Sequence, residues 1–174
     1  MNGILGIFSP DDVVKDQFLK FIENDKRSKI DLGKGGEMSY TSYQIDSYDE
    51  SLVELYSKHL DSYVGTYVKN NYLNCIWYQI YEARSGSFHG YHTHDAIDCQ
   101  VSGIYYLKLP DTSVSTEFMI DNTPRQLDVK EGDVVLFDSR IEHRSPPNHS
   151  PYDKIILSFN LYCGSDFVFY NEDR

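Results

Sequence analysis

Two histidines separated by a single residue, His92 and His94, are the first residues whose type and spacing indicate a definite chemistry. They stand just before a strand-like segment, in the stretch HGYHTHDAIDCQVSGIYYLKLP at residues 89–110. Side chains at positions i and i+2 of a strand point to the same face, so both imidazoles project together if the chain is extended there. Two imidazoles on one face can bind one metal ion, provided that a third ligand comes from elsewhere.

The third ligand is expected to be His143, in the segment FDSRIEHRSPPN. It follows an apolar strand and precedes a proline turn, which places it at a strand end, where a pocket would open. Three ligands with open positions are how non-haem Fe(II) enzymes hold the metal while leaving room for substrate and oxygen. The other histidines are interpreted as non-ligands: His89 as a solvent-exposed residue of a glycine-rich turn, His149 as a loop residue, and His59 as a residue on a helix surface.

Two aspartates after the pair leave one ligand position open. Asp95 points away from His92 in a regular strand, but a bend would bring its carboxylate to the metal, which makes it a rival to His94. Asp98 could instead orient a ligating imidazole by accepting a hydrogen bond from it. The sequence therefore predicts a site of three histidines, or of two histidines and one carboxylate.

A lysine opens the last strand-like segment, KIILSFNLY at residues 154–162. Alternation places Lys154 on one face of this segment together with Ile156, Ser158 and Asn160. Such a polar stripe is common on the solvent side of an antiparallel strand. The functional alternative is that the Lys154 ammonium binds a ligand carboxylate and that Ser158 adds a hydrogen bond.

The elements expected to position these residues are helices in the first half of the chain and strands in the second. Ser9-Pro10-Asp11-Asp12 is a helix-start signal, and Asp49 and Glu50 open a second helix whose apolar face extends to Val64. Residues 31–43 form a loop that leads into a strand. The further strands are expected at 73–83, 101–109, 115–120, 126–129, 134–138 and 154–162. This order predicts an antiparallel sandwich or barrel with helices packed on one side.

Length and composition narrow the classes of function. The 174 residues fit one domain, 1–174, in which 1–70 supply helical and loop support and 71–170 the β core. The net charge of −11 opposes a large nucleic-acid footprint. No apolar run is long enough to cross a bilayer, and no signal peptide is expected. Three widely spaced cysteines, an odd number without a CxxC pair, indicate a reducing compartment and a cytoplasmic protein.

Taken in order, these segments resemble the Fe(II)/2-oxoglutarate-dependent oxygenases, and among them the prolyl-4-hydroxylase-like branch with an HxH motif. The resemblance spans roughly residues 77–161. It rests on an ordered set of segments rather than on any single one: HTH at 92–94, SGIYYLKLP at 102–110, EGDVVLFDSRIEHRSPPN at 131–148 and KIILSFN at 154–160.

The resemblance implies a mainly β fold with flanking helices, built on a double-stranded β-helix (jelly-roll, cupin-like) core. His92 and His143 match metal ligands of the family. His94 stands where most members have aspartate or glutamate, so the resemblance implies either a three-histidine site or a site completed by Asp95.

The resemblance also implies a cosubstrate site. Lys154 stands where the family more often has an arginine that binds the distal carboxylate of 2-oxoglutarate. Tyr106 matches a position that often contacts the same carboxylate, and Tyr81 is a second tyrosine expected in this pocket. Segments 31–39 and 84–91 are hypothesised to cover the site.

The implied activity is hydroxylation that uses Fe(II), O₂ and 2-oxoglutarate. The primary substrate is expected to be a peptide, an amino acid or a metabolite, and the sequence does not fix the oligomeric state. Two alternatives stay open: a cupin-type metalloprotein, such as a three-histidine dioxygenase that does not use 2-oxoglutarate, and a non-catalytic binding module. Burial of Lys154 near the metal, beside a tyrosine hydroxyl, would favour 2-oxoglutarate.

Overall fold

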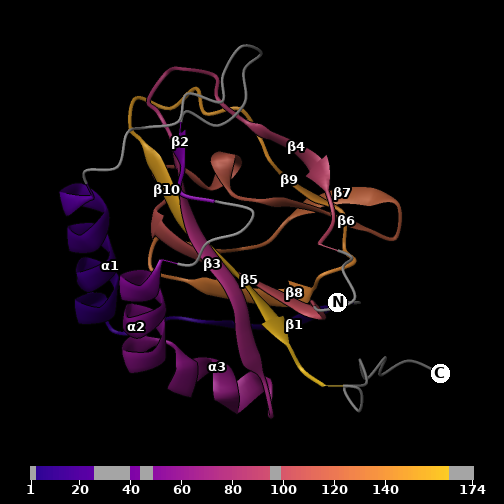
Figure 1. Cartoon of the computed structure of the whole chain (residues 1–174). Helices are drawn as coiled ribbons and strands as arrows, with labels where there is room; N and C mark the ends of the chain where they lie inside the picture. Colours follow the sequence, from indigo (N-terminus) through magenta and orange to yellow (C-terminus); the bar gives the residue numbers. More distant parts are fainter. Residues whose placement is uncertain (1–2, 26–39, 44–48, 95–98, 165–174) are drawn as a thin grey trace.

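The computed structural model describes residues 3–25, 40–43, 49–94 and 99–164 (Figure 1). Its strands form two antiparallel sheets. The larger sheet has the order β1 (Ile4–Phe8), β8 (Val134–Asp138), β5 (Val101–Lys108), β10 (Lys154–Tyr162), β3 (Tyr72–Tyr81) and β2 (Tyr40–Thr41). The smaller sheet has the order β4 (His89–His92), β9 (His143–Ser145), β6 (Glu117–Ile120) and β7 (Thr123–Gln126). This confirms the expected mainly β jelly-roll core with flanking helices.

Three helices cover the outer face of the larger sheet, on the side away from β4, β6, β7 and β9 (Figure 1). They are α1 (Asp12–Asn24), α2 (Glu50–His59) and α3 (Asp61–Tyr67). The Asp49 carboxylate accepts hydrogen bonds from the backbone N–H groups at the start of α2, as its position in the sequence predicts. The stretch expected to be one helix is two, because the chain turns at Leu60 before α3 begins.

Alternation along the central strand β10 gives the sheet two different faces. Leu157, Phe159 and Leu161 face the helices and join the larger apolar cluster with Phe18 and Tyr56. Ile156 faces the smaller sheet and joins a second apolar cluster, which includes residues of both sheets: Ile104, Phe118, Phe137 and Ile156. The core therefore consists of one layer beneath the helices and another between the two sheets.

The polar stripe of β10 lies between the sheets and not on the surface. Lys154, Ser158 and Asn160 are all buried, and Lys154 has no exposed surface. The solvent-face interpretation of this stripe is wrong, because helices cover one face of β10 and the smaller sheet covers the other. A short 3-10 turn, η1 (Thr112–Val114), joins β5 to β6.

Two strands differ from expectation. The strand expected at 126–129 is wrong: β7 ends at Gln126, because Asp121 and Asn122 adopt positive φ angles of 51° and 56° and close a two-residue hairpin between β6 and β7. Leu127 and Val129 are buried outside any strand. The strand β1 was not expected; it pairs with β8 and extends the larger sheet by one strand.

Within the described ranges, no helix has both the length and the apolar composition that crossing a bilayer requires.

Candidate metal centre and cosubstrate pocket

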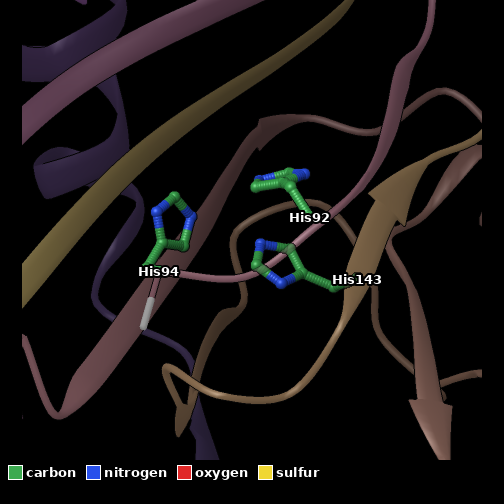
Figure 2. Close-up of side chains that lie close together, drawn as sticks. All are labelled: His92, His94 and His143. Atoms are coloured by element: carbon green, nitrogen blue, oxygen red, sulfur yellow. The ribbon is translucent and has the colours of Figure 1, made fainter. Parts of the chain in front are cut away.

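Three histidines meet where the smaller sheet faces the larger one (Figure 2). His92 and His143 are cross-strand partners in β4 and β9, and their ring centroids are 4.3 Å apart. His94 follows the end of β4, with its ring centroid 5.0 Å from that of His92 and 5.2 Å from that of His143. One nitrogen from each ring lies within 4.8 Å of the others, so a single metal ion could contact all three. We call these residues the histidine end of the cavity.

Backbone carbonyls orient two of the three imidazoles. His92 Nδ1 lies 2.8 Å from the Gly90 carbonyl oxygen, and His143 Nδ1 lies 2.9 Å from that of Ile141. A carbonyl oxygen can only accept, so we assign the proton of each ring to Nδ1, which leaves the Nε2 lone pair for a metal. A carbonyl within β4 and a carbonyl in the turn before β9 thus accept the hydrogen bonds that fix both rings.

Burial keeps these imidazoles neutral. Desolvation lowers the pKa of His92, lowers that of His94 to about 4, and lowers that of His143 well below its ordinary value. A neutral imidazole is the form that binds metal, so no proton has to leave at neutral pH. The backbone N–H of His94 donates to the Ser139 carbonyl at 2.9 Å, which anchors that residue. Asp95 and Asp98 lie outside the described residues, so the rival carboxylate stays a prediction.

His89 is not the exposed turn residue that the sequence analysis expected. It begins β4, is half-buried, and stacks on the His92 ring at a centroid separation of 4.0 Å. A bulge in β4 explains this position: His89 pairs with Ser145 and His92 with His143, so three steps on β4 match two on β9, and both histidines face the cavity. Residues 89–91 of the hypothesised cover therefore belong to the cavity's own strand.

The other two histidines agree with the sequence analysis. His149 is exposed in a loop, and His59 is partly exposed at the last position of α2.

A buried lysine lies at the other end of the cavity wall. Lys154 Nζ donates to the Ser145 hydroxyl oxygen at 2.7 Å and lies 5.0 Å from the centroid of the Tyr81 ring. The Tyr81 side chain is also buried, and both Tyr81 and Ser145 line the cavity. No carboxylate pairs with Lys154 among the residues that the structure describes, and burial lowers its pKa to about 7. A buried cation in this state is suited to an anionic ligand.

Thr116 was missed by the sequence analysis. It directly precedes β6, where Glu117 and Phe118 pair with Arg144 and His143, so Thr116 comes next to Ser145. Its hydroxyl is buried, lines the cavity and has no hydrogen-bond partner in the described structure. A single threonine beside a strand forms no sequence motif, so the sequence could not identify Thr116 as a site residue. We call Lys154, Tyr81, Ser145 and Thr116 the lysine end of the cavity.

Comparison with known proteins relates this geometry to solved structures. No protein-family model and no curated protein sequence matches the chain. HygX from Streptomyces hygroscopicus, solved with nickel and 2-oxoglutarate bound, has a TM-score of 0.68 at 13% identity, over 93% of this chain and 83% of that one. A Trichoplax adhaerens prolyl hydroxylase, in complex with a hypoxia-inducible-factor peptide fragment, has a TM-score of 0.65 at 16% identity, over 94% and 84%.

A third similar structure is the viral collagen prolyl hydroxylase of Paramecium bursaria Chlorella virus-1 with 2-oxoglutarate, at a TM-score of 0.59 and 14% identity, over 92% of this chain and 96% of that one. The chain has the fold of the 2-oxoglutarate oxygenases. This oxygenase fold is a double-stranded β-helix, and it confirms the fold that the HxH and SGIYY segments implied.

The oxygenase fold brings most of the predicted residues into one cavity. His92, His94, His143, Tyr81 and Ser158 all line it, and Lys154 contacts Tyr81 and Ser145 of its wall. Tyr106 is fully buried behind Thr116, whose backbone N–H donates to the Tyr106 hydroxyl at 3.2 Å, so its contact with a cosubstrate stays a prediction.

Ser158 lies apart from the lysine end. It stands four positions along β10 from Lys154, roughly 13 Å at the usual rise per residue. Its hydroxyl donates to Gln79 Oε1 at 3.0 Å. The hydrogen bond from Ser158 to the cosubstrate also stays a prediction.

Proposed function

We propose that this protein is a non-haem Fe(II) and 2-oxoglutarate-dependent oxygenase, a hydroxylase of a second, organic substrate. The observation that carries the proposal is the pairing, in one cavity of the oxygenase fold, of a three-histidine cluster with a buried Lys154 that lacks a carboxylate partner in the described structure. We further propose that the whole chain is a single oxygenase domain and that it acts in the cytoplasm, where its three free cysteines stay reduced.

The residues present fit both groups. The three imidazoles are neutral and close together, and carbonyl hydrogen bonds to two of them direct Nε2 of His92 and His143 inward. At the lysine end, a buried ammonium and the unpartnered Thr116 hydroxyl provide donors for a carboxylate. A dicarboxylate that binds the metal with one end and Lys154 with the other would satisfy both sets of groups.

In this proposal each residue has a defined task. The histidine end would hold Fe(II), and the bound metal with 2-oxoglutarate and O₂ would supply the oxidising chemistry that gives succinate, CO₂ and a hydroxylated substrate. Lys154 binds the distal carboxylate and is itself positioned by Ser145 and Tyr81. The apolar side chains of Ile156 and Phe137 at the cavity wall exclude water from this region.

The second candidate is a three-histidine cupin-type dioxygenase that does not use 2-oxoglutarate. The neutral His94, standing where a carboxylate would complete the usual triad, favours it. The buried Lys154 favours the first candidate, because a cupin that binds no dicarboxylate would gain nothing from burying an ammonium at that position.

The test is an anaerobic titration of the purified protein with Fe(II) and then 2-oxoglutarate, followed by the metal-to-ligand charge-transfer absorption band. We expect the band in the wild type and its loss or weakening in Lys154→Ala. Absence of the band in wild-type protein that binds Fe(II) would overturn the proposal and leave the cupin alternative. Absence of any Fe(II) or Mn(II) binding would leave the non-catalytic binding module.

A further inference from the structure

The cavity continues past His94 in the direction away from Lys154. Five neutral side chains line this part, which we call the amide arm: Trp77, Gln79, Ser102, Ser158 and Asn160. They come from β3, β5 and β10, where Ser158 is paired with Trp77 and Asn160 with Ser102. Metal and cosubstrate binding, as proposed above, make no use of the amide arm.

Two hydrogen bonds organise the carboxamides of the amide arm. Ser158 Oγ donates to Gln79 Oε1 at 3.0 Å, and Ser102 Oγ donates to Asn160 Oδ1 at 2.8 Å. Within the part of the chain that the structure describes, Asn160 Nδ2 donates only to the Cys75 sulfur, at 3.4 Å, and a thiol is a weak acceptor. Elsewhere the space between the sheets is filled by apolar residues such as Ile104 and Phe118. A buried polar stripe costs stability compared with an apolar one, so its presence calls for a polar ligand.

The amide arm is uncharged. Among the described residues that line the whole cavity there is no carboxylate. Of the two cations at the cavity, Arg144 is paired with Glu117 at 2.8 Å and Lys154 is engaged at the opposite end. A charged group placed in the amide arm would lose its hydration without gaining a counter-ion, which is costly. A neutral group with both a donor and an acceptor would pair with the carboxamides without that penalty.

Trp77 supplies the wall of the amide arm nearest the histidine end. Its ring centroid lies 5.7 Å from that of His94, and Tyr43 packs edge-on against it at 5.2 Å. The ring is therefore held in place, and it offers an apolar surface beside the polar side chains. A ligand that carries a short apolar segment next to its polar group would contact both.

We propose that the primary substrate places a neutral hydrogen-bonding group, with a carboxamide as the best match, in the amide arm against Gln79 and Asn160 and beside Trp77. Because a carboxamide both donates and accepts, it can pair reciprocally with a second carboxamide. The substrate class is thus an uncharged amide-bearing compound, free or as part of a peptide. The inference rests on the proposed function only for the statement that this ligand is the substrate.

The chain contains a single tryptophan, so its intrinsic fluorescence reports on the amide arm itself. The experiment uses the full-length protein with redox-inert Zn(II) and 2-oxoglutarate, titrated with three fragments of matched size: butyramide, butyrate and butylamine. We expect butyramide to change the Trp77 emission saturably, with an affinity at least about tenfold above that of either charged fragment, because only the charged fragments pay an uncompensated desolvation cost.

Two variants locate the binding. Asn160→Leu, nearly equal in volume, is expected to weaken butyramide binding about tenfold, the usual cost of an unpaired polar partner. Ser102→Ala, a smaller change, serves the same purpose if the leucine variant does not fold. Asn24→Leu, at an exposed position of α1, is the matched control and should bind as wild type does.

The outcomes separate this inference from the proposed function. Charged fragments that bind as well as butyramide, or butyramide binding that is unchanged in Asn160→Leu and Ser102→Ala, would overturn the inference. If butyramide binds as expected but wild-type protein shows no Fe(II)/2-oxoglutarate absorption band, the proposed function fails and the ligand preference of the amide arm stands. If the band is present and butyramide does not bind, the inference alone fails.

Discussion

At the histidine end of the cavity burial lowers the pKa of three imidazoles and leaves them neutral, whereas at the lysine end burial acts on an ammonium that has no carboxylate partner in the described structure. Neutral imidazoles whose Nδ1–H groups meet carbonyl oxygens cost the ligand-free protein little. A buried ammonium hydrogen-bonded only to a serine costs it several kcal/mol.

The two ends therefore differ in how burial contributes to the binding energy of a ligand. The histidine end is preorganised for a cation, and its neutral imidazoles destabilise the ligand-free protein little. The lysine end is destabilised until an anion arrives, so binding of a carboxylate there relieves a cost that the fold already carries. Variants at the histidine end should therefore change metal affinity, whereas variants at the lysine end should change cosubstrate affinity and stability.

The largest effect is expected at the histidine end. His143→Ala removes one of the three nitrogens proposed to bind the metal and should lower Mn(II) or Fe(II) affinity by at least about a hundredfold, since even residues outside the coordination shell change affinity by 10–100-fold. Isothermal titration calorimetry measures it, with circular dichroism to verify the fold. His149→Ala, at an exposed loop position, is the matched control. Full affinity in His143→Ala would remove this residue from the site.

At the lysine end, Lys154→Met should weaken 2-oxoglutarate binding on the order of a hundredfold or more, because truncating one partner of a buried charge pair costs roughly 2–5 kcal/mol. Metal affinity should not change. The free energy of unfolding of the ligand-free variant should rise, because an unpaired buried charge is gone. Lys130→Met, at an exposed position, is the control in both measurements. A variant that loses stability and keeps its cosubstrate affinity would contradict the comparison.

The pH dependence separates the two ends further. Lys154 has a pKa of about 7 in the folded protein, against roughly 10.4 in an unfolded chain. In the proposed function the ammonium form binds the carboxylate, so the dissociation constant of 2-oxoglutarate should rise up to about tenfold for each pH unit above 7.

Rising pH should weaken 2-oxoglutarate binding but stabilise the ligand-free protein. Between pH 7 and roughly 8.5 the unfolded chain holds more protons, because its Lys154 is still protonated and its thiols have not yet ionised, so the free energy of unfolding should rise with pH in that window. Both trends should disappear in Lys154→Met. The histidines do not contribute there, because their lowered pKa values keep them neutral throughout that pH window. Calorimetric titrations and urea unfolding at a series of pH values measure the two trends; a flat binding profile would show that Lys154 does not bind the anion.

The parts of the site that the sequence could predict are those encoded by patterns of neighbouring residues. The strands of the larger sheet have strong local patterns, so β3, β5, β8 and β10 and the shared face of Lys154, Ser158 and Asn160 follow from the sequence, whereas the burial of that face depends on the smaller sheet. The HxH spacing and the position of His143 at a strand end were sufficient to predict that these three histidines lie close together. These features depend on neighbouring residues only.

The misses depend on pairing between strands. The inward face of His89 arises from a bulge that is defined by register against Ser145, and a glycine at position 90 was the only local sign of it. The end of β7 is set by the hairpin at Asp121 and Asn122, which a pattern of apolar residues does not reveal. Thr116 owes its place to the register of β6 with β9. No local pattern encodes these three results.

The smallest expected effect concerns Thr116. Its buried hydroxyl is unpartnered in the ligand-free cavity, so Thr116→Val, which keeps the shape, should stabilise the free protein by about 1 kcal/mol. If the hydroxyl donates to the distal carboxylate, the same change should weaken 2-oxoglutarate binding about fivefold, the net worth of one hydrogen bond.

Ser115→Ala is the matched control, because Ser115 Oγ is also buried and without a hydrogen-bond partner in the described structure, and Ser115 is not among the residues that line the cavity. It should stabilise the protein and leave the affinity unchanged. Equal weakening in both variants would mean that the effect travels through the strand and not through the Thr116 hydroxyl.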